Sequence, residues 1–276
     1  MTPQGPAETF DGTTLGPIWN KLKGQERVMT EADAWFAHSQ VLTDRRLDSS
    51  HRAGIRAYIT ASQLIGFARE HQHFLEASLT LPGSHVYPHA TPNLIRPAFE
   101  SALIALWILD GPNADERRLR GLRHCWEDQR QSNNWADELL VSSLVDVTTT
   151  DRVREARDVV RKRYHADAAD LHLTWDQVTR RPDLLKAIDS LTHVDRQPLL
   201  KPFLRSIWRR LSGLQHGLSY ASLLSAEMEV KVPVPGGLQV TLLTDDDALM
   251  TDCKASALVQ SWAMHTYLTR TRTLDS

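Results

Sequence analysis

The chain has 276 residues, of which 41% are hydrophobic and 24% charged, the composition of an ordinary globular protein with ample core. Its formal net charge of -2 excludes a uniformly basic surface, so any nucleic-acid contact requires a local basic patch. The only cysteines, Cys125 and Cys253, lie far apart and predict neither a disulfide framework nor a zinc site. Since no signal-peptide pattern or long apolar run is present, we expect a soluble cytoplasmic protein that does not contact membranes.

The first half of the chain predicts a tail followed by helices. Residues 1–24 are rich in Pro, Gly and Thr, which predicts a flexible N-terminal tail. Helical spacing of apolar residues predicts helices over about 29–42 and 50–78, and the prolines within 79–93 predict a loop. From Ile95 to Leu109 the apolar residues repeat in alternating steps of four and three, which is typical of a buried seam in a helix bundle. Pro97 places the start of that helix near Arg96.

The second half predicts further helices and one strand pair. Helices are expected over about 114–143, 151–170, 182–190 and 198–227, with a last helix from about 245 to 271. Between the last two, alternating valines around a Pro-Gly-Gly break predict a β-hairpin at about 229–243. No change in composition marks a second domain. The predicted fold is therefore all-α, a single up-and-down helical bundle over residues 25–276 with one small β-hairpin insert before the last helix.

The predicted helix over 198–227 carries the clearest basic patch. Residues 201–210 contain four basic side chains and no acidic one. Residues seven apart on a helix differ by only about 20° of rotation, so Arg209 and His216 are expected on one face. Gly213 and Gly217 flank that histidine, although glycine costs about 1 kcal/mol in a helix interior. A close-packed neighbour or a ligand would explain this loss.

An arginine that can hold a phosphate, beside a histidine that can move protons, is the combination needed to cleave a phosphodiester without a metal. The pattern of an Arg followed by four to six residues and a His, late in an all-helical bundle, resembles the signature of HEPN-like domains. The match is Arg209 or Arg210 to His216. The resemblance implies an RNA-binding protein or a metal-independent ribonuclease, in a toxin or phage-defence role, acting as a homodimer without a cofactor. The predicted site comprises Arg209 and His216 as catalytic residues and Arg205, Arg210, Ser212 and Tyr220 as substrate-binding residues.

The same spacing occurs near His51 and near His124, and only the helical and basic surroundings favour His216. A supporting polar pair is predicted at Arg96 and Glu100, where Glu100 could orient the His216 imidazole from across the bundle. Glu70 and His73 give half of a di-iron motif with no second half, so no metal site is expected.

The alternative function is a non-catalytic helical module that binds a small ligand or a partner protein. In this alternative the β-hairpin at 229–243 and the loop at 80–93 would be the recognition elements. The chain has no glycine-rich phosphate loop and no Gly-x-Ser-x-Gly motif, which disfavours the common kinase, dinucleotide-binding and hydrolase classes.

Overall fold

The computed structural model describes residues 12–31, 39–46, 53–81, 86, 90–141, 147–195, 197–224, 226–234 and 237–272. Helices dominate these ranges, and the chain is divided into two compact units. Unit 1 comprises Met1–Asp33, Gln63–Leu106 and Ile188–His265, and unit 2 comprises Ala34–Ser62, Trp107–Ala187 and Thr266–Ser276. The expected single up-and-down bundle is therefore wrong, because the residues form two separate clusters of contacts rather than one.

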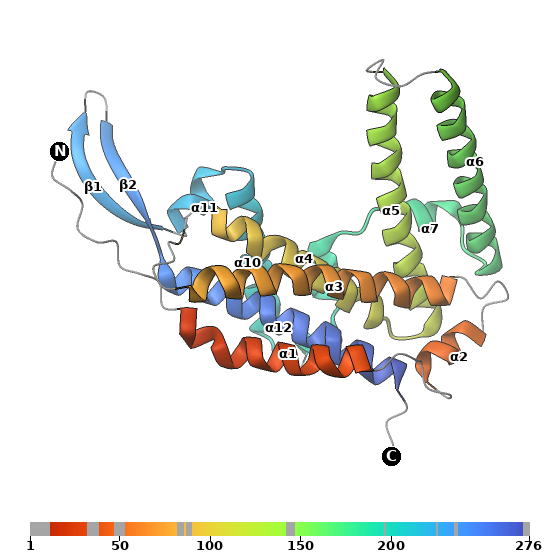
Figure 1. Ribbon diagram of the computed structural model, residues 1–276, viewed down its shortest axis with the longest axis horizontal. Coiled ribbons are helices and arrows are strands. Elements are labelled where there is room, and N and C mark those ends of the chain that lie inside the picture. The colour runs from red at the N-terminus through yellow and green to blue at the C-terminus, as the bar shows by residue number, and fades with distance from the viewer. Residues whose placement is uncertain are drawn as a thin grey trace. The chain divides into compact units, whose positions relative to one another are not determined.

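Figure 1 shows the helices and strands and labels most of them. The elements from the N-terminus to the centre of the chain are η1 (Gly12–Leu15), α1 (Gly16–Glu31), α2 (Gln40–Arg46), α3 (Ala53–Thr80), α4 (Ala90–Leu109), α5 (Ala114–Val141) and α6 (Val147–Asp170). Those that follow are α7 (Trp175–Thr179), α8 (Leu184–Asp189), α9 (Thr192–Asp195), α10 (Leu200–Gln215), α11 (Ser219–Leu224), β1 (Ala226–Val234), β2 (Gly237–Thr244) and α12 (Asp246–Thr271).

The core of unit 1 includes a helix inside the segment predicted to be a tail. Helix α1 begins at Gly16 and buries Trp19 and Leu22. The Trp19 indole donates a hydrogen bond of 3.3 Å to Gln72 of α3, whose amide in turn donates one of 2.8 Å to Ser256 of α12. The proline that suggested a tail, Pro17, lies in the first turn of α1, where a missing N–H costs nothing.

Helix α4 carries the buried seam that the spacing predicts. Ile95, Phe99, Ala102 and Leu106 are each 0% exposed. The helix begins at Ala90, however, earlier than Pro97 indicated, and this proline lies within the helix instead of in its first turn. Although α4 is strongly apolar, none of the helices in the described ranges combines the length and the apolar character that crossing a membrane would require.

Strands β1 and β2 form an antiparallel pair that follows α11 in unit 1. Their register pairs Ala226 with Thr244 and Val234 with Gly237, with an irregularity between Val230 and Val232. The strands thus extend beyond the expected limits of 229 and 243.

In unit 2, α5 and α6 form a long antiparallel pair (Figure 1). Leu122, Tyr164, Ala168 and Val178 form its buried apolar cluster.

A second buried cluster of unit 2 is polar. The Asp44 carboxylate accepts hydrogen bonds of 2.7 Å from Nε and Nη2 of Arg117 and one of 2.8 Å from the Tyr58 hydroxyl. Asp44 and Arg117 are almost completely buried, so this ion pair is satisfied internally.

Candidate functional site

The basic patch of the sequence lines an open groove in unit 1, here called the α10 groove. Its lining residues are Asp189 of α8, Lys201, Pro202, Arg205, Ser206, Arg209 and Arg210 of α10, and Tyr220 of α11. The groove has a volume of about 700 Å³, within the range of ligand sites. Helix α10 is amphipathic, and its buried leucines and isoleucine fix which face carries the cations. Four basic side chains and one carboxylate give the groove a positive balance.

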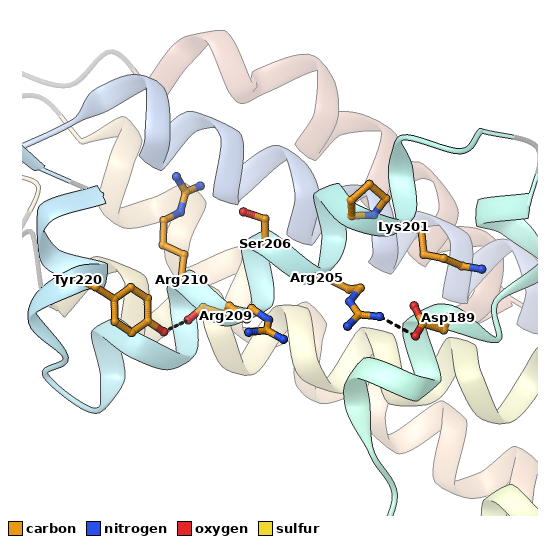
Figure 2. A pocket seen from close by; sticks show the side chains of 8 residues that line it. Asp189, Lys201, Arg205, Ser206, Arg209, Arg210 and Tyr220 are labelled. Atoms are coloured by element: carbon orange, nitrogen blue, oxygen red, sulfur yellow. Dashed lines mark hydrogen bonds and ion pairs between the residues drawn. The ribbon is translucent and has the colours of Figure 1, made fainter.

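The basic side chains of the groove differ in their partners (Figure 2). Arg205 donates a hydrogen bond of 2.7 Å to Asp189, and both side chains are more than one-third exposed. Lys201 lies 3.9 Å from Asp195. Figure 2 shows the Arg209 side chain pointing the same way as that of Arg205, and no described residue pairs with its guanidinium. Arg209 thus presents an exposed positive charge that no carboxylate of the described residues neutralises.

Arg210 points away from Arg209 and binds α12 (Figure 2). Its Nη2 donates a hydrogen bond of 2.5 Å to the Asp252 carboxylate and one of 3.3 Å to the Ala248 carbonyl. Asp252 is only 3% exposed, and this burial raises its pKa to about 6 although the Arg210 charge acts in the opposite direction. Arg210 therefore lines the groove while its guanidinium is bonded to α12, and its role as a substrate ligand stays a prediction.

The predicted helix over 198–227 is interrupted at residues 216–218, which separate α10 from α11. His216 is the C-cap of α10, and Gly217 follows with a φ of +64°, a conformation that glycine adopts without strain. The Gly217 N–H donates to the Leu214 carbonyl at 3.1 Å, and the Leu218 N–H donates to the Gly213 carbonyl at 2.9 Å. This pair of bonds is a Schellman motif, which satisfies the last carbonyls of the helix.

Gly213 allows α11 to pack directly on α10. A Cβ atom at this position would lie 2.6 Å from the Cβ of Ala221 and 2.8 Å from the Tyr220 hydroxyl. That hydroxyl donates a hydrogen bond of 3.1 Å to the Arg209 carbonyl. The ring of Tyr220, which is 48% exposed, is thereby held at one end of the groove beside Arg209 (Figure 2).

The structure does not bring all predicted site residues together. His216 is exposed but does not line the groove, and Ser212 does not line it either. His216 is the C-cap directly after Gln215, the last residue of α10, and its N–H still donates a helical hydrogen bond of 3.2 Å to the Ser212 carbonyl. Glu100 accepts hydrogen bonds of 2.8 Å from Arg96 and 2.9 Å from the Trp208 indole, so its described partners do not include the His216 imidazole.

The acidic residue of the groove was not found by the sequence analysis. Asp189, on α8, approaches Arg205 only through the fold, since it lies 16 positions earlier in the chain. Its place in a short helix gave no signal of a role in the site.

No protein-family model matches the chain, and searches of curated proteins and of solved structures likewise found no match. The HEPN-like resemblance therefore stays a prediction.

Proposed function

We propose that this protein binds single-stranded RNA in the α10 groove. The observation that carries the proposal is the exposed Arg209 guanidinium, with which no described residue pairs, beside the exposed ring of Tyr220. Proteins that bind single strands combine a positive groove, which follows the phosphates, with aromatic rings on which bases stack. Arginine also contacts a phosphate through two parallel hydrogen bonds, which makes it a stronger ligand than a point charge.

The spacing of the cations suits an extended backbone. Lys201, Arg205 and Arg209 follow one another at intervals of four residues, so each step advances about 6 Å along the α10 axis. They form a row that can contact successive phosphates. The pair between Arg205 and Asp189 does not prevent this, because a solvent-exposed ion pair contributes at most about 1 kcal/mol and can be exchanged for a phosphate.

The proposal concerns binding and does not include cleavage. His216 is not among the lining residues of the α10 groove, so the proposal gives it no role. Among HEPN-like domains some members serve as binding modules, and this is the form of the resemblance that the arrangement favours. The proposal includes the homodimer that the resemblance implies.

The test is a titration of a fluorescently labelled single-stranded RNA, followed by anisotropy at several salt concentrations. The logarithm of the binding constant falls against the logarithm of salt with a slope of about -0.7 per phosphate contacted by a single strand. Removing one such contact in Arg209→Gln should therefore reduce the slope by about 0.7 and weaken binding about tenfold or more. Lys254→Gln, which removes an exposed charge from α12 outside the groove, is the control and should leave both quantities unchanged.

Two further variants separate binding from cleavage. Tyr220→Leu should weaken binding by about 1–3 kcal/mol through lost stacking, whereas His216→Ala should bind as the unmodified protein does. The RNA should stay intact in EDTA. Equal affinity and salt slope in Arg209→Gln and the unmodified protein would refute the proposal. Cleavage that His216→Ala abolishes would replace it with a nuclease.

A further inference from the structure

Unit 2 contains a second pocket, between α5, α6 and α7, that the sequence analysis did not find. Its lining residues are Trp126, Gln129, Asn133, Arg157, Asp158, Arg161 and Trp175. Here it is called the tryptophan pocket. Its volume of about 410 Å³ lies within the range of sites that bind small molecules. Two indoles, two guanidinium groups, a carboxylate and two side-chain amides thus surround one small space.

The two indoles of this pocket are held in fixed positions. Their rings meet edge to face at 4.7 Å. Trp126 also contacts the ring of Tyr164 at 5.4 Å, and His165 stacks on Trp175 at 3.7 Å. Both indoles pack against the apolar cluster of unit 2. A planar ligand would therefore meet aromatic surfaces that are already ordered, which lowers the entropy cost of binding.

The guanidinium groups of the pocket have hydrogen-bonding capacity that the described residues do not use. Arg161 is exposed, and no described carboxylate pairs with it. Arg157, one turn earlier on α6, donates through Nη1 to Asp137 and through Nη2 to the Asn133 carbonyl. Its Nε is buried and has no acceptor among the described residues. Because this Nε is enclosed by protein atoms, the exposed Arg161 is the guanidinium that a ligand can reach.

The remaining polar groups suit the edge of a base or the hydroxyls of a ribose. The Gln129 amide donates a hydrogen bond of 2.9 Å to the Asn133 side-chain oxygen, which leaves the oxygen of Gln129 and the NH₂ group of Asn133 for a ligand. The Asp158 carboxylate can accept from a hydroxyl or an amino group. It also offsets one of the two arginine charges, so the pocket suits a small ligand of limited negative charge better than a long polyanion.

We propose that the tryptophan pocket binds a free mononucleotide. The nucleobase contacts Trp126 and Trp175, and the phosphate accepts hydrogen bonds from the exposed Arg161 guanidinium. This site is independent of the RNA proposed for the α10 groove, because the two sets of lining residues belong to different units.

The test is isothermal titration calorimetry of the full chain with the monophosphates of adenosine, guanosine, cytidine and uridine, and with adenosine and inorganic phosphate alone. At least one monophosphate should bind with a stoichiometry of one, at least about tenfold more tightly than the nucleoside or the phosphate, because only the nucleotide fills both parts of the pocket. Arg161→Gln should weaken that binding about tenfold or more. Arg163→Gln is the matched control, since it removes an exposed arginine of the same helix that does not line the pocket.

Two outcomes would overturn the proposal. One is the absence of binding by all four monophosphates at millimolar concentration. The other is equal nucleotide affinity in Arg161→Gln and Arg163→Gln. If Arg209→Gln abolishes nucleotide binding while Arg161→Gln leaves it intact, the nucleotide occupies the α10 groove and the pocket has no such role. Retained nucleotide binding in Arg209→Gln, together with lost RNA binding, would keep this proposal and the proposed function separate.

Discussion

The packing of α11 on α10 predicts that Gly213→Ala destabilises the protein, whereas helix propensity alone predicts that it stabilises the protein. Alanine at an interior helix position is more favourable than glycine by about 1 kcal/mol. In Gly213→Ala, however, the new Cβ would lie 2.6 Å from the Cβ of Ala221, far inside the optimal carbon–carbon separation of about 3.5–4.0 Å. Ala221 is fully buried and its Cβ is fixed to the α11 backbone, so α11 itself must shift.

Inserting one methyl group into a close-packed contact costs about 1–3 kcal/mol. After the gain in propensity is subtracted, Gly213→Ala should lower the free energy of unfolding by about 1 kcal/mol. Urea unfolding measures this difference. Gly66→Ala in α3 is the control, because its new Cβ would have no atom within 4 Å, and it should stabilise by about 0.5–1 kcal/mol. Equal stabilisation in the two variants would refute the described packing of α11.

The same substitution links the fold to the proposed function. A shift of α11 moves Tyr220, whose hydroxyl is bonded to the Arg209 carbonyl, away from its place in the groove. Gly213→Ala should therefore weaken RNA binding, whereas Gly66→Ala should leave it unchanged. A less stable Gly213→Ala protein with undiminished RNA affinity would mean that the position of Tyr220 does not matter for binding.

Two ion pairs, Arg117–Asp44 and Arg96–Glu100, should differ in how much their loss lowers the free energy of unfolding. Burial raises the pKa of Asp44, but hydrogen bonds from Arg117, Gln40 and Tyr58 outweigh this effect and hold the pKa below the ordinary value of 3.8. The ionised carboxylate therefore stabilises the fold fully above pH 3.8. This stabilisation is lost as the pH falls through the lower pKa of the folded state. At pH 7, Asp44→Asn should lower the free energy of unfolding by about 3–5 kcal/mol, since Arg117 stays buried without its charged partner. Urea unfolding at pH 7 and below about pH 4 measures the acid dependence of stability, which should be smaller in this variant because residue 44 no longer titrates. Glu100→Gln should cost less than about 1 kcal/mol, because Glu100 is partly exposed; a loss as large as that of Asp44→Asn would contradict this.

The sequence was most informative where one periodic pattern had one physical explanation. The steps of four and three from Ile95 to Leu106 can be satisfied only by burying one side of a helix, and these residues are buried. Residues 216–218 had two explanations. The glycines beside His216 predict either a close-packed neighbour or a ligand, but glycine is also the most common residue directly after a helix C-cap, which is the position of Gly217. The close contact that explains Gly213 depends on Ala221 and Tyr220, which approach it only after that turn forms.

Other parts of the fold gave weaker or misleading signals. Helix α7 was not predicted, although Thr174 and Gln177 form its capping box and were visible as a threonine followed three residues later by a glutamine. The division into two units has no counterpart in composition, because it depends on which helix faces meet. The tryptophan pocket is hidden for the same reason: its lining comes from three helices, and each residue alone is an ordinary core or surface residue.

The exposure and the hydrogen-bond partners of an arginine identify a candidate site better than its spacing from a histidine does. The same spacing before His124 involves Arg117 and Arg118, and both of these arginines are buried and bonded to Asp44. A guanidinium that is buried inside the fold cannot reach a phosphate in solution. Arg209 has the same spacing but is exposed, and no described residue pairs with it. Because a motif records positions and not partners, it could not separate these two cases. The exposure of Arg209, and the absence of a partner for it among the described residues, make the α10 groove the candidate for an anionic ligand.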